Sequence, residues 1–470
     1  MMKTVKLTIG LLGVMLFSAC SDFLKESSQD EVIVQTVTDY AEFLLGSGYP
    51  QPAVSIPYGV LYLVDDDVEV NEARLTASDN TTVSTRYGYF TWQPDMWERV
   101  GGTTLANGYS QTYERIMGCN AVLDYIDEAF GDDILRWRTK AEAYAIRGLL
   151  YWQLVNMYAE PYNEHKEGLG VVLKLTSGLV ENGMRRASVE TVYENILSDL
   201  KRAEELFLRV DLTRGGYRIN LTSVYMLLSR VYLYMERWEE SIDAATKAIA
   251  LSEGLSDYTQ ITATTIYLNN YELSEVELLF GAGRFDLSNG MNSSGYRPSQ
   301  ELLSLFPAGD QRLLWFSADR QSVLKCNTSV TPTSLLRISE TYLNRAEAYV
   351  RQGSGQSQAL ADLNELRRHR IIGYTNVTIT DATQLLNAIR VERRLELCFE
   401  AHRWFDLRRS GMPSISHVYR TKNTDPELRY TLNARDPLYT LPIPASMQEH
   451  NMSLEQNSSA DAPERIGVPN

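Results

Sequence analysis

Hydrophobic residues recur every three or four positions over long stretches of the chain, and this spacing is typical of amphipathic helices. Pro161 ends the first such helix because it cannot continue the backbone hydrogen bonding, and Ser188 can cap the second through its hydroxyl. The pattern predicts a mostly α-helical protein. The apolar face of the first stretch comprises Trp137, Ala141, Tyr144, Gly148, Trp152 and Val155. The face of the second comprises Val192, Ile196, Leu200, Ala203 and Phe207.

Two later stretches have the pattern of antiparallel helix pairs that combine small and large residues. One occupies residues 335–370, with a break at Gly353 to Gly355. The other resembles one tetratricopeptide repeat (TPR), in which small side chains let two helices approach and large ones fill the gap. Because one pair cannot bury its apolar face alone, we expect several pairs to stack as a scaffold. The matching positions are Leu228, Ser229, Tyr232, Trp238, Ser241, Ala245 and Ala248.

Two other segments, residues 47–110 and 255–335, lack this periodicity. They are rich in glycine, asparagine, serine, threonine and aromatic residues. Long irregular segments inside a domain are commonly functional loops, so these two are predicted to carry a binding site.

Residues 390–411 interleave arginines with carboxylates around leucine, phenylalanine and tryptophan. A helix is predicted to begin at the capping pair Asp381 and Gln384 and to end at Gly411. The three-residue spacings predict ion pairs along its surface. Each carboxylate then has a guanidinium group that favours its ionised form, so the stretch is interpreted as structural rather than catalytic. The predicted pairs are Arg393–Glu396 and Glu400–Arg403.

The N-terminus has a short basic region and an apolar run that stops at Cys20, preceded by small residues. This order is typical of a lipoprotein signal peptide: residues 1–19 would be removed and Cys20 acylated. An ordinary secretory peptide with an incidental cysteine is the alternative. The polar residues 20–36 are expected to form a flexible tether. No later run is long and apolar enough to predict a transmembrane helix.

The formal net charge of −15 argues against unaided binding to nucleic acid. Cys119, Cys326 and Cys398 stand at no metal-like spacing, so buried thiols are expected instead of a disulfide framework. The five histidines form no recognisable ligand pair. The sequence therefore predicts no cofactor and no metal site, and it singles out no catalytic carboxylate pair.

Several motifs resemble the SusD/RagB family. The charged stretch is similar to the family's C-terminal signature, with Arg-Trp-Phe-Asp-Leu-Arg-Arg at 403–409, and segments 113–126 and 141–162 resemble its first half. Ala401 stands where glycine is usual, and 255–335 matches none of the family's motifs. The preceding helix matches at Arg337, Glu340, Tyr342, Leu343, Arg345, Ala346, Glu347 and Ala348. The closing segment matches at Pro442, Ile443, Pro444, Asn451, Leu454, Gln456 and Asn457.

This resemblance implies one mostly α-helical domain over residues 37–470, in which TPR-like helix pairs form a scaffold and long loops carry the ligand site. It also implies a lipid-anchored protein of the outer-membrane surface. Such a protein binds a glycan without cleaving it and passes it to a SusC-like TonB-dependent transporter. The expected parts are an N-terminal half (37–220), a TPR-like pair (221–252), a loop-rich ligand region (253–335) and a C-terminal half (336–470).

Aromatic rings in the irregular segments are the candidate glycan contacts. Sugars present apolar C–H faces on which flat rings can stack while polar neighbours bind the hydroxyl groups. Rings on helix faces are assigned to packing, and those off the helices are expected to be exposed. The candidates are Tyr87, Tyr89, Trp92, Trp97, Tyr296, Arg297 and Trp315.

Two alternatives stay open. Asp65 to Asp67 can be a cation or sugar contact, although an acidic solvated turn is the more ordinary role for loop charges. The whole chain can also be a TPR-type lipoprotein scaffold that binds a protein or peptide and no sugar. The two aromatic-rich segments favour the glycan hypothesis, because a pure scaffold needs few long insertions.

Overall fold

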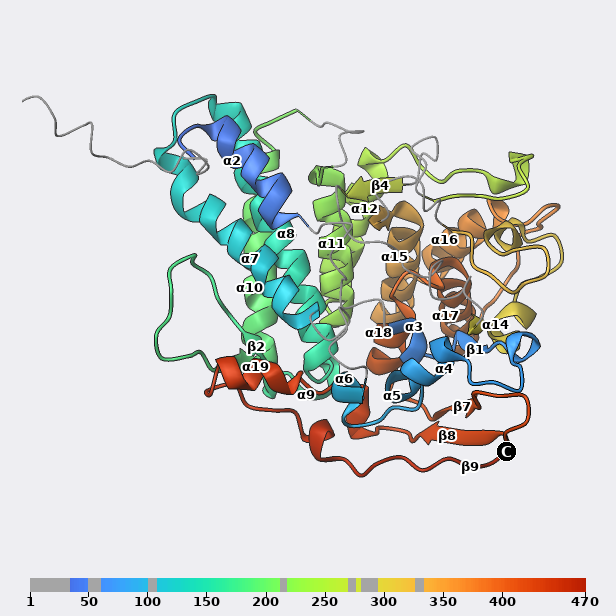
Figure 1. Ribbon diagram of the computed structural model, residues 1–470. Coiled ribbons are helices and arrows are strands. Elements are labelled where there is room, and N and C mark those ends of the chain that lie inside the picture. The colour runs from blue at the N-terminus through green and yellow to red at the C-terminus, as the bar shows by residue number, and fades with distance from the viewer. Residues whose placement is uncertain are drawn as a thin grey trace, which may run out of the picture.

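Antiparallel helices packed one after another form one side of the protein, and short helices, strands and loops cover the other (Figure 1). The computed structural model describes residues 34–49, 61–99, 108–211, 218–268, 276–279, 295–325 and 334–470. The main helices of these residues are α2 (Val37–Phe43), α7 (Gly108–Tyr125), α8 (Asp133–Tyr158), α10 (Val189–Phe207), α11 (Leu221–Tyr234), α12 (Trp238–Leu251), α15 (Ile338–Gln352), α16 (Gln356–Arg368), α17 (Ala382–Leu397) and α18 (Arg403–Arg409). Shorter helices are α3 (Leu61–Val64), α4 (Thr81–Thr85), α5 (Tyr87–Phe90), α6 (Met96–Arg99), α9 (Tyr162–His165), α14 (Gln300–Ser304) and α19 (Ala445–His450).

The strands are short and lie mostly at the loop-rich end and along the base of the molecule in Figure 1. They form two-stranded antiparallel sheets (β1–β5, β2–β3 and β4–β6) and one sheet in the order β7–β8–β9. Their bounds are β1 (Val68–Val70), β2 (Leu169–Val172), β3 (Arg186–Ser188), β4 (Val276–Leu279), β5 (Tyr296–Pro298), β6 (Ser334–Arg337), β7 (Ile415–Tyr419), β8 (Leu428–Leu432) and β9 (Val468–Pro469). Single turns of other helix types are η1 (Leu44–Gly48), η3 (Glu72–Arg74), η4 (Ile126–Glu128), η5 (Tyr258–Gln260), η6 (Gln311–Trp315), η7 (Pro437–Tyr439) and η8 (Ser458–Asp461).

The first two periodic stretches fold as the predicted helices α8 and α10. The Ser188 hydroxyl accepts a hydrogen bond from the backbone N–H of Thr191 at 3.1 Å, which confirms the predicted cap. The two helices pack against each other at Gly148, where a Cβ would lie only 3.4 Å from Cγ of Leu200. The absence of a side chain at Gly148 leaves the two helices in close contact at this point.

The two predicted helix pairs are also present, as α11–α12 and α15–α16, and α12 packs on α15. Small polar residues join the helices: Ser241 Oγ donates to the carbonyl oxygen of Ser229 at 2.9 Å, and Asn344 Nδ2 donates to Ser229 Oγ at 3.0 Å. Gly353 ends α15 in the left-handed conformation with φ of 84°, as a helix C-cap glycine does. The stacked scaffold predicted from the pattern is confirmed.

The two irregular segments are linked to each other in space. Strand β1 follows α3 in the first segment and pairs with β5 of the second, so that Val68 lies opposite Pro298 and Val70 opposite Tyr296. The β7–β8 hairpin packs beside β1. Segments more than 200 residues apart therefore form one end of the molecule (Figure 1).

Cys119 and Cys398 are buried free thiols, and burial raises the pKa of each to about 12. This confirms the expectation of buried thiols for these two residues. Cys20 and Cys326 lie outside the described residues, as do residues 1–33 as a whole. Within the part of the chain that the structure describes, no helix combines the length and apolar character needed to cross a bilayer.

The charged helix is not continuous, which corrects the sequence prediction. Helix α17 ends at Leu397 and α18 begins at Arg403. Between them Phe399 and Ala401 both have a φ of 61°, in the left-handed region that disfavours side chains. The break lets Phe399 enter the core, where its ring packs edge-on against Phe316 at 6.1 Å between centroids. Local periodicity could not reveal it, because the reason lies in distant partners.

We predict that Ala401→Gly raises the free energy of unfolding by about 0.5–1 kcal/mol, because glycine adopts positive φ without strain. Urea unfolding followed by circular dichroism measures the difference. Ala361→Gly is the matched control: this exposed residue lies within α16, and glycine there should lower stability by about 1 kcal/mol. Equal losses in both variants would contradict strain at Ala401.

Candidate functional site

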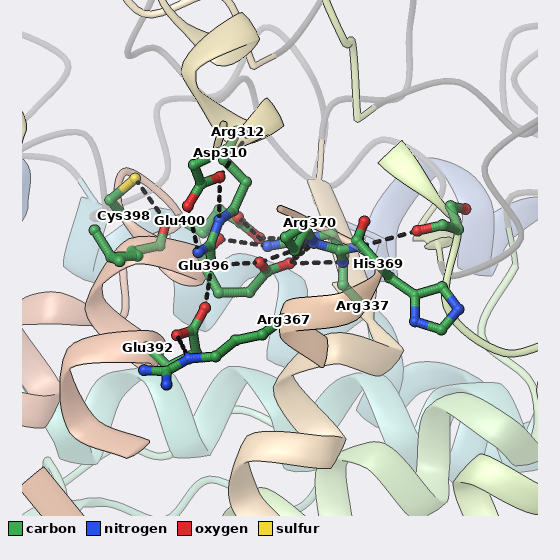
Figure 2. A network of polar contacts seen from close by, with 12 residues as sticks. Asp310, Arg312, Arg337, Arg367, His369, Arg370, Glu392, Glu396, Cys398 and Glu400 are labelled. Atoms are coloured by element: carbon green, nitrogen blue, oxygen red, sulfur yellow. Dashed lines mark hydrogen bonds and ion pairs between the residues drawn. The ribbon is translucent and has the colours of Figure 1, made fainter. Parts of the chain in front are cut away.

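A buried network of arginines and carboxylates lies where α17 meets the loop-rich end (Figure 2). Its centre is Glu396, which accepts hydrogen bonds from Arg337 Nη1 at 2.6 Å and Arg370 Nη2 at 3.0 Å. Arg312 Nη1 donates to the same carboxylate at 3.1 Å. Burial alone would raise the pKa of Glu396, but the three guanidinium groups hold it well below its ordinary value. The carboxylate is therefore ionised and structural.

Glu400 and Trp315 extend this network. Glu400 Oε1 accepts from Lys325 Nζ and from Arg337 Nη2, each at 2.7 Å. Lys325 Nζ also lies 3.9 Å from the centroid of the Trp315 ring, a cation–π contact. Trp315 is fully buried, so the expectation that it is an exposed stacking ring is wrong. Its ring instead packs against the cations Lys325 and Arg337 of the buried charge network.

The charged residues of α17 and α18 bind partners from other elements. Arg393 Nε donates to Asp406 at 2.8 Å, and Arg403 Nε donates to Asp66 at 2.6 Å. Burial alone would raise the pKa of Asp406, but Arg393 and the neighbouring Arg409 lower it to about 2. The structural interpretation of the stretch agrees with these contacts, but the partners were predicted wrongly. The incorrect pairs are Arg393–Glu396 and Glu400–Arg403.

The acidic triplet Asp65 to Asp67 is not a solvated turn, which corrects the preferred sequence interpretation. Asp65 and Asp67 are buried, and Arg394 Nε donates to Asp67 at 2.8 Å. Arg403 binds both oxygens of Asp66, at 2.6 and 2.7 Å. Burial, with Asp67 and Asp66 close by, raises the pKa of Asp65 well above its ordinary value. Two arginines near the C-terminus thus hold the segment between α3 and β1.

A polar cleft of about 730 Å³ lies beside this triplet. One wall is β1 and the turn after it, the other is the β7–β8 hairpin, and α18 and the start of α14 close the base. Ser414 and Ser416 present exposed positions on the hairpin wall. The lining comprises Asp66, Val68, Glu69, Val70, Glu72, Phe90, Ser299, Glu301, Arg403, Leu407, Pro413, Ser414, Ile415, Ser416, His417, Val418, Glu427 and Arg429.

The carboxylates of the cleft are neutralised in place. Each is bound by an arginine, so the lining offers many hydrogen-bonding groups without a large excess charge. Arg297, a predicted ligand contact, takes part in this pairing. The pairs are Asp66–Arg403, Glu69–Arg297, Glu72–Arg420, Glu427–Arg420 and Glu301–Arg394.

The two tryptophans chosen as ligand contacts are core residues. Trp92 is fully buried; its indole N–H donates to the carbonyl oxygen of Val64 at 2.9 Å, and its ring stacks on His417 at 4.3 Å. The indole N–H of Trp97 donates to the carbonyl oxygen of Pro442 at 2.7 Å. The expectation that both rings are exposed is wrong, because buried indoles satisfy their N–H groups through partners distant in sequence.

The predicted tyrosines are likewise packed. Tyr89 and Tyr296 are fully buried. Tyr87 is half-buried, with its ring edge-on to Tyr419 at 5.2 Å and Tyr430 at 5.9 Å between centroids. These rings stabilise the loop-rich end and do not form the exposed platform expected from the sequence.

Sequence reasoning missed the hairpin wall of the cleft. Its signal was present, because residues 415–419 alternate inward and outward positions as a strand with one buried face does. His417 points inward and Ser416 outward. The sequence did not show which strand pairs with residues 415–419, so it could not place them at a cleft.

Two family models match the chain. The model of the SusD family matches residues 315–459, and one described as "Starch-binding associating with outer membrane" matches residues 53–233. The chain belongs to the SusD/RagB family. The first of these regions contains the motif helix, the C-terminal segment and most of the charge network, including Glu396, Arg337 and Arg370.

Known proteins agree with this assignment. The chain is 30% identical over 129 residues to SusD-like protein P2 of Formosa agariphila, a match that spans 26% of this chain and 25% of that protein. A SusD superfamily structure from Bacteroides thetaiotaomicron has a TM-score of 0.72 at 22% identity, covering 90% of this chain and 99% of that one. A laminarin-binding SusD-like protein has a TM-score of 0.63 at 19% identity over the same shares. These structural similarities establish a shared fold.

We predict that Glu400→Gln lowers the free energy of unfolding by about 3 kcal/mol, because it leaves Lys325 and Arg337 buried with less compensating charge. Although burial opposes it, those cations lower the pKa of Glu400 below its ordinary 4.5. Its contribution is thus present above that pH and is lost as the pH falls through the folded-state pKa. The difference between wild type and variant should shrink in acid.

Chemical denaturation at pH 7 and at pH 4 measures both effects. Glu240→Gln is the control, because Glu240 forms an exposed ion pair with Arg237 on α12 and should cost under about 1 kcal/mol. Equal stability of Glu400→Gln and wild type at pH 7 would refute the structural role.

Proposed function

We propose that this protein is a non-enzymatic, lipid-anchored glycan-binding protein of the cell surface. It captures an oligosaccharide in the polar cleft and delivers it to a SusC-like TonB-dependent transporter in the outer membrane. The observation that carries the proposal is the cleft itself, whose charges are paired and whose walls come from both irregular segments and the hairpin.

The chemistry of the cleft suits a ligand with many hydroxyl groups. Paired carboxylates and guanidinium groups can accept from and donate to neutral hydroxyls without burying an unpaired charge. Val68, Val70 and Val418 add apolar surface for C–H faces. The volume of about 730 Å³ is in the range of roughly 300–1,000 Å³ usual for ligand sites.

A binding role is supported over a catalytic one by the state of the cleft carboxylates. Asp66 is partly enclosed, and although burial raises its pKa, Arg403 and Arg394 bring the pKa below its ordinary value. General acid catalysis at neutral pH needs a carboxyl with a raised pKa that faces the ligand. The starch-binding description of the family model that matches residues 53–233 and the laminarin-binding structural relative also favour glycan binding.

We predict that Ser416→Trp lowers glycan affinity at least tenfold, because Ser416 is an exposed residue of β7 in the lining of the cleft and a bulky ring there would obstruct it. A glycan array with wild type first identifies a bound oligosaccharide, and calorimetry then compares the variants. Thr424→Trp, in the exposed turn between β7 and β8 and outside the cleft lining, is the control and should bind normally.

The outcomes separate clearly. Undiminished affinity of Ser416→Trp would move the site elsewhere in the protein. Absence of binding to every arrayed glycan, together with capture of an unfolded peptide, would favour the peptide-scaffold function instead.

We predict that Cys20→Ser abolishes membrane association, because two ester-linked chains and one amide-linked chain are expected on this cysteine. Membrane fractionation and metabolic labelling with a fatty acid, in the native host, measure anchoring. Cys119→Ser is the control, since that thiol is buried in the fold. Unchanged labelling of Cys20→Ser would refute the anchor.

A further inference from the structure

A second, smaller cavity of about 180 Å³ adjoins the polar cleft. The two share Arg403, Leu407 and Pro413 in their linings, so they meet at α18. We call this cavity the arginine pocket, because five guanidinium groups and a single carboxylate, that of Asp406, line it. The arginines are Arg390, Arg393, Arg394, Arg403 and Arg409.

Four of these arginines are held by carboxylates, and the fifth is not. Arg409, for example, binds both oxygens of Glu347 at 2.8 Å. Arg390 forms no ion pair with any carboxylate among the described residues, and its buried Nε has no hydrogen-bond acceptor there. Nη2 of Arg393 also lacks a hydrogen-bond acceptor among them, and it lies 3.7 Å from a carboxylate oxygen of Glu340.

An unpaired guanidinium group in a partly enclosed site is costly, since its charge loses hydration without gaining a counter-charge. Burial and the positive charges of Arg351 and Arg409 lower the pKa of Arg390, although Glu347 opposes them. A bound anion would supply the missing acceptor. The planar guanidinium fork matches a carboxylate or a sulfate in two parallel hydrogen bonds.

We propose that the arginine pocket receives a single oxyanion of the glycan, a uronate carboxylate or a sulfate ester, while the neutral remainder lies in the polar cleft. This inference rests on the proposed function. The guanidinium group of Arg390, which forms no ion pair among the described residues, would bind the oxyanion. Arg403 lies where the two cavities meet.

The polar cleft restricts the ligand further. Glu69, Glu72 and Glu427 line the cleft and occupy the guanidinium groups of Arg297 and Arg420, so these two arginines are not available to a densely charged polyanion. Each of these carboxylates is paired with an arginine, Glu72 and Glu427 with the same one, and each can still accept hydrogen bonds from hydroxyl groups. The preferred substrate class is therefore a mainly neutral oligosaccharide with isolated acidic groups.

Calorimetry with matched probes tests the inference. Xylotriose bearing one glucuronate is compared with xylotetraose, and a sulfated carrageenan oligosaccharide with a neutral agarose oligosaccharide of equal length. At least one acidic oligosaccharide should bind wild type at least tenfold more tightly than its neutral partner. A preference in the glucuronate pair indicates a carboxylate ligand, and a preference in the carrageenan pair indicates a sulfate ester. Added salt should reduce this preference.

Arg390→Gln should abolish the preference for the acidic member and leave binding of the neutral member unchanged. Arg202→Gln is the charge-matched control, because Arg202 is exposed on α10, far from both cavities in sequence, and pairs only with Glu205 in the described residues. Arg390→Lys keeps the charge without the fork and should retain part of the preference. Thermal unfolding checks that each variant is folded. If Arg390→Gln does not fold, Arg390→Lys replaces it in the test.

Three results would overturn the inference. Equal binding of acidic and neutral members refutes it and leaves the proposed function intact. An acidic preference that survives Arg390→Gln refutes the arginine pocket as its source. Failure to bind any glycan, here or on the array, refutes the proposed function and this inference with it.

Discussion

The carboxylate of Glu396, held by three buried guanidinium groups, is the interaction on which the arrangement of the C-terminal half depends. Its three partners come from β6, from η6 and from the turn after α16. An ionised carboxylate without them would cost several kcal/mol in a site closed to water. The ion pairs to Glu396 therefore fix these three segments relative to α17, although the segments share no hydrophobic periodicity. They also attach the loop-rich end to the helical scaffold.

The same principle positions the polar cleft. Arg394, near the end of α17, binds Asp67, which lies 327 residues earlier in the chain. Arg403, at the start of α18, binds Asp66, which lies 337 residues earlier. Strand β1 follows directly, so the wall of the cleft is tied to the charge network. Because these ion pairs fix the lining side chains before a ligand arrives, less conformational entropy is lost on binding than in a flexible loop.

Local sequence information was sufficient for most of the main helices, but not for the break between α17 and α18 or for the site. The positions of α8, α10 and the two helix pairs follow from periodicity and caps such as Ser188, since both depend on neighbours within a few residues. The burial of Trp92 depends on His417, and the partner of Arg403 is Asp66. Neither contact can be predicted from the spacing of neighbouring residues. Large aromatic residues in glycine-rich segments can pack in a core as well as contact a ligand.

A cleft lined by ion pairs constrains how its specificity can change. Replacing a paired residue such as Asp66 would leave Arg403 uncompensated and disturb the placement of β1, so binding and stability are coupled there. Ser414 and Ser416 are different, because they lie on an exposed edge of the hairpin outside the charge network. Substitutions at the hairpin alter the shape and hydrogen bonding of the cleft with little cost to the framework. Under the proposed function, selection for a new glycan would therefore act first on this wall, while the arginine-rich helices stay constant.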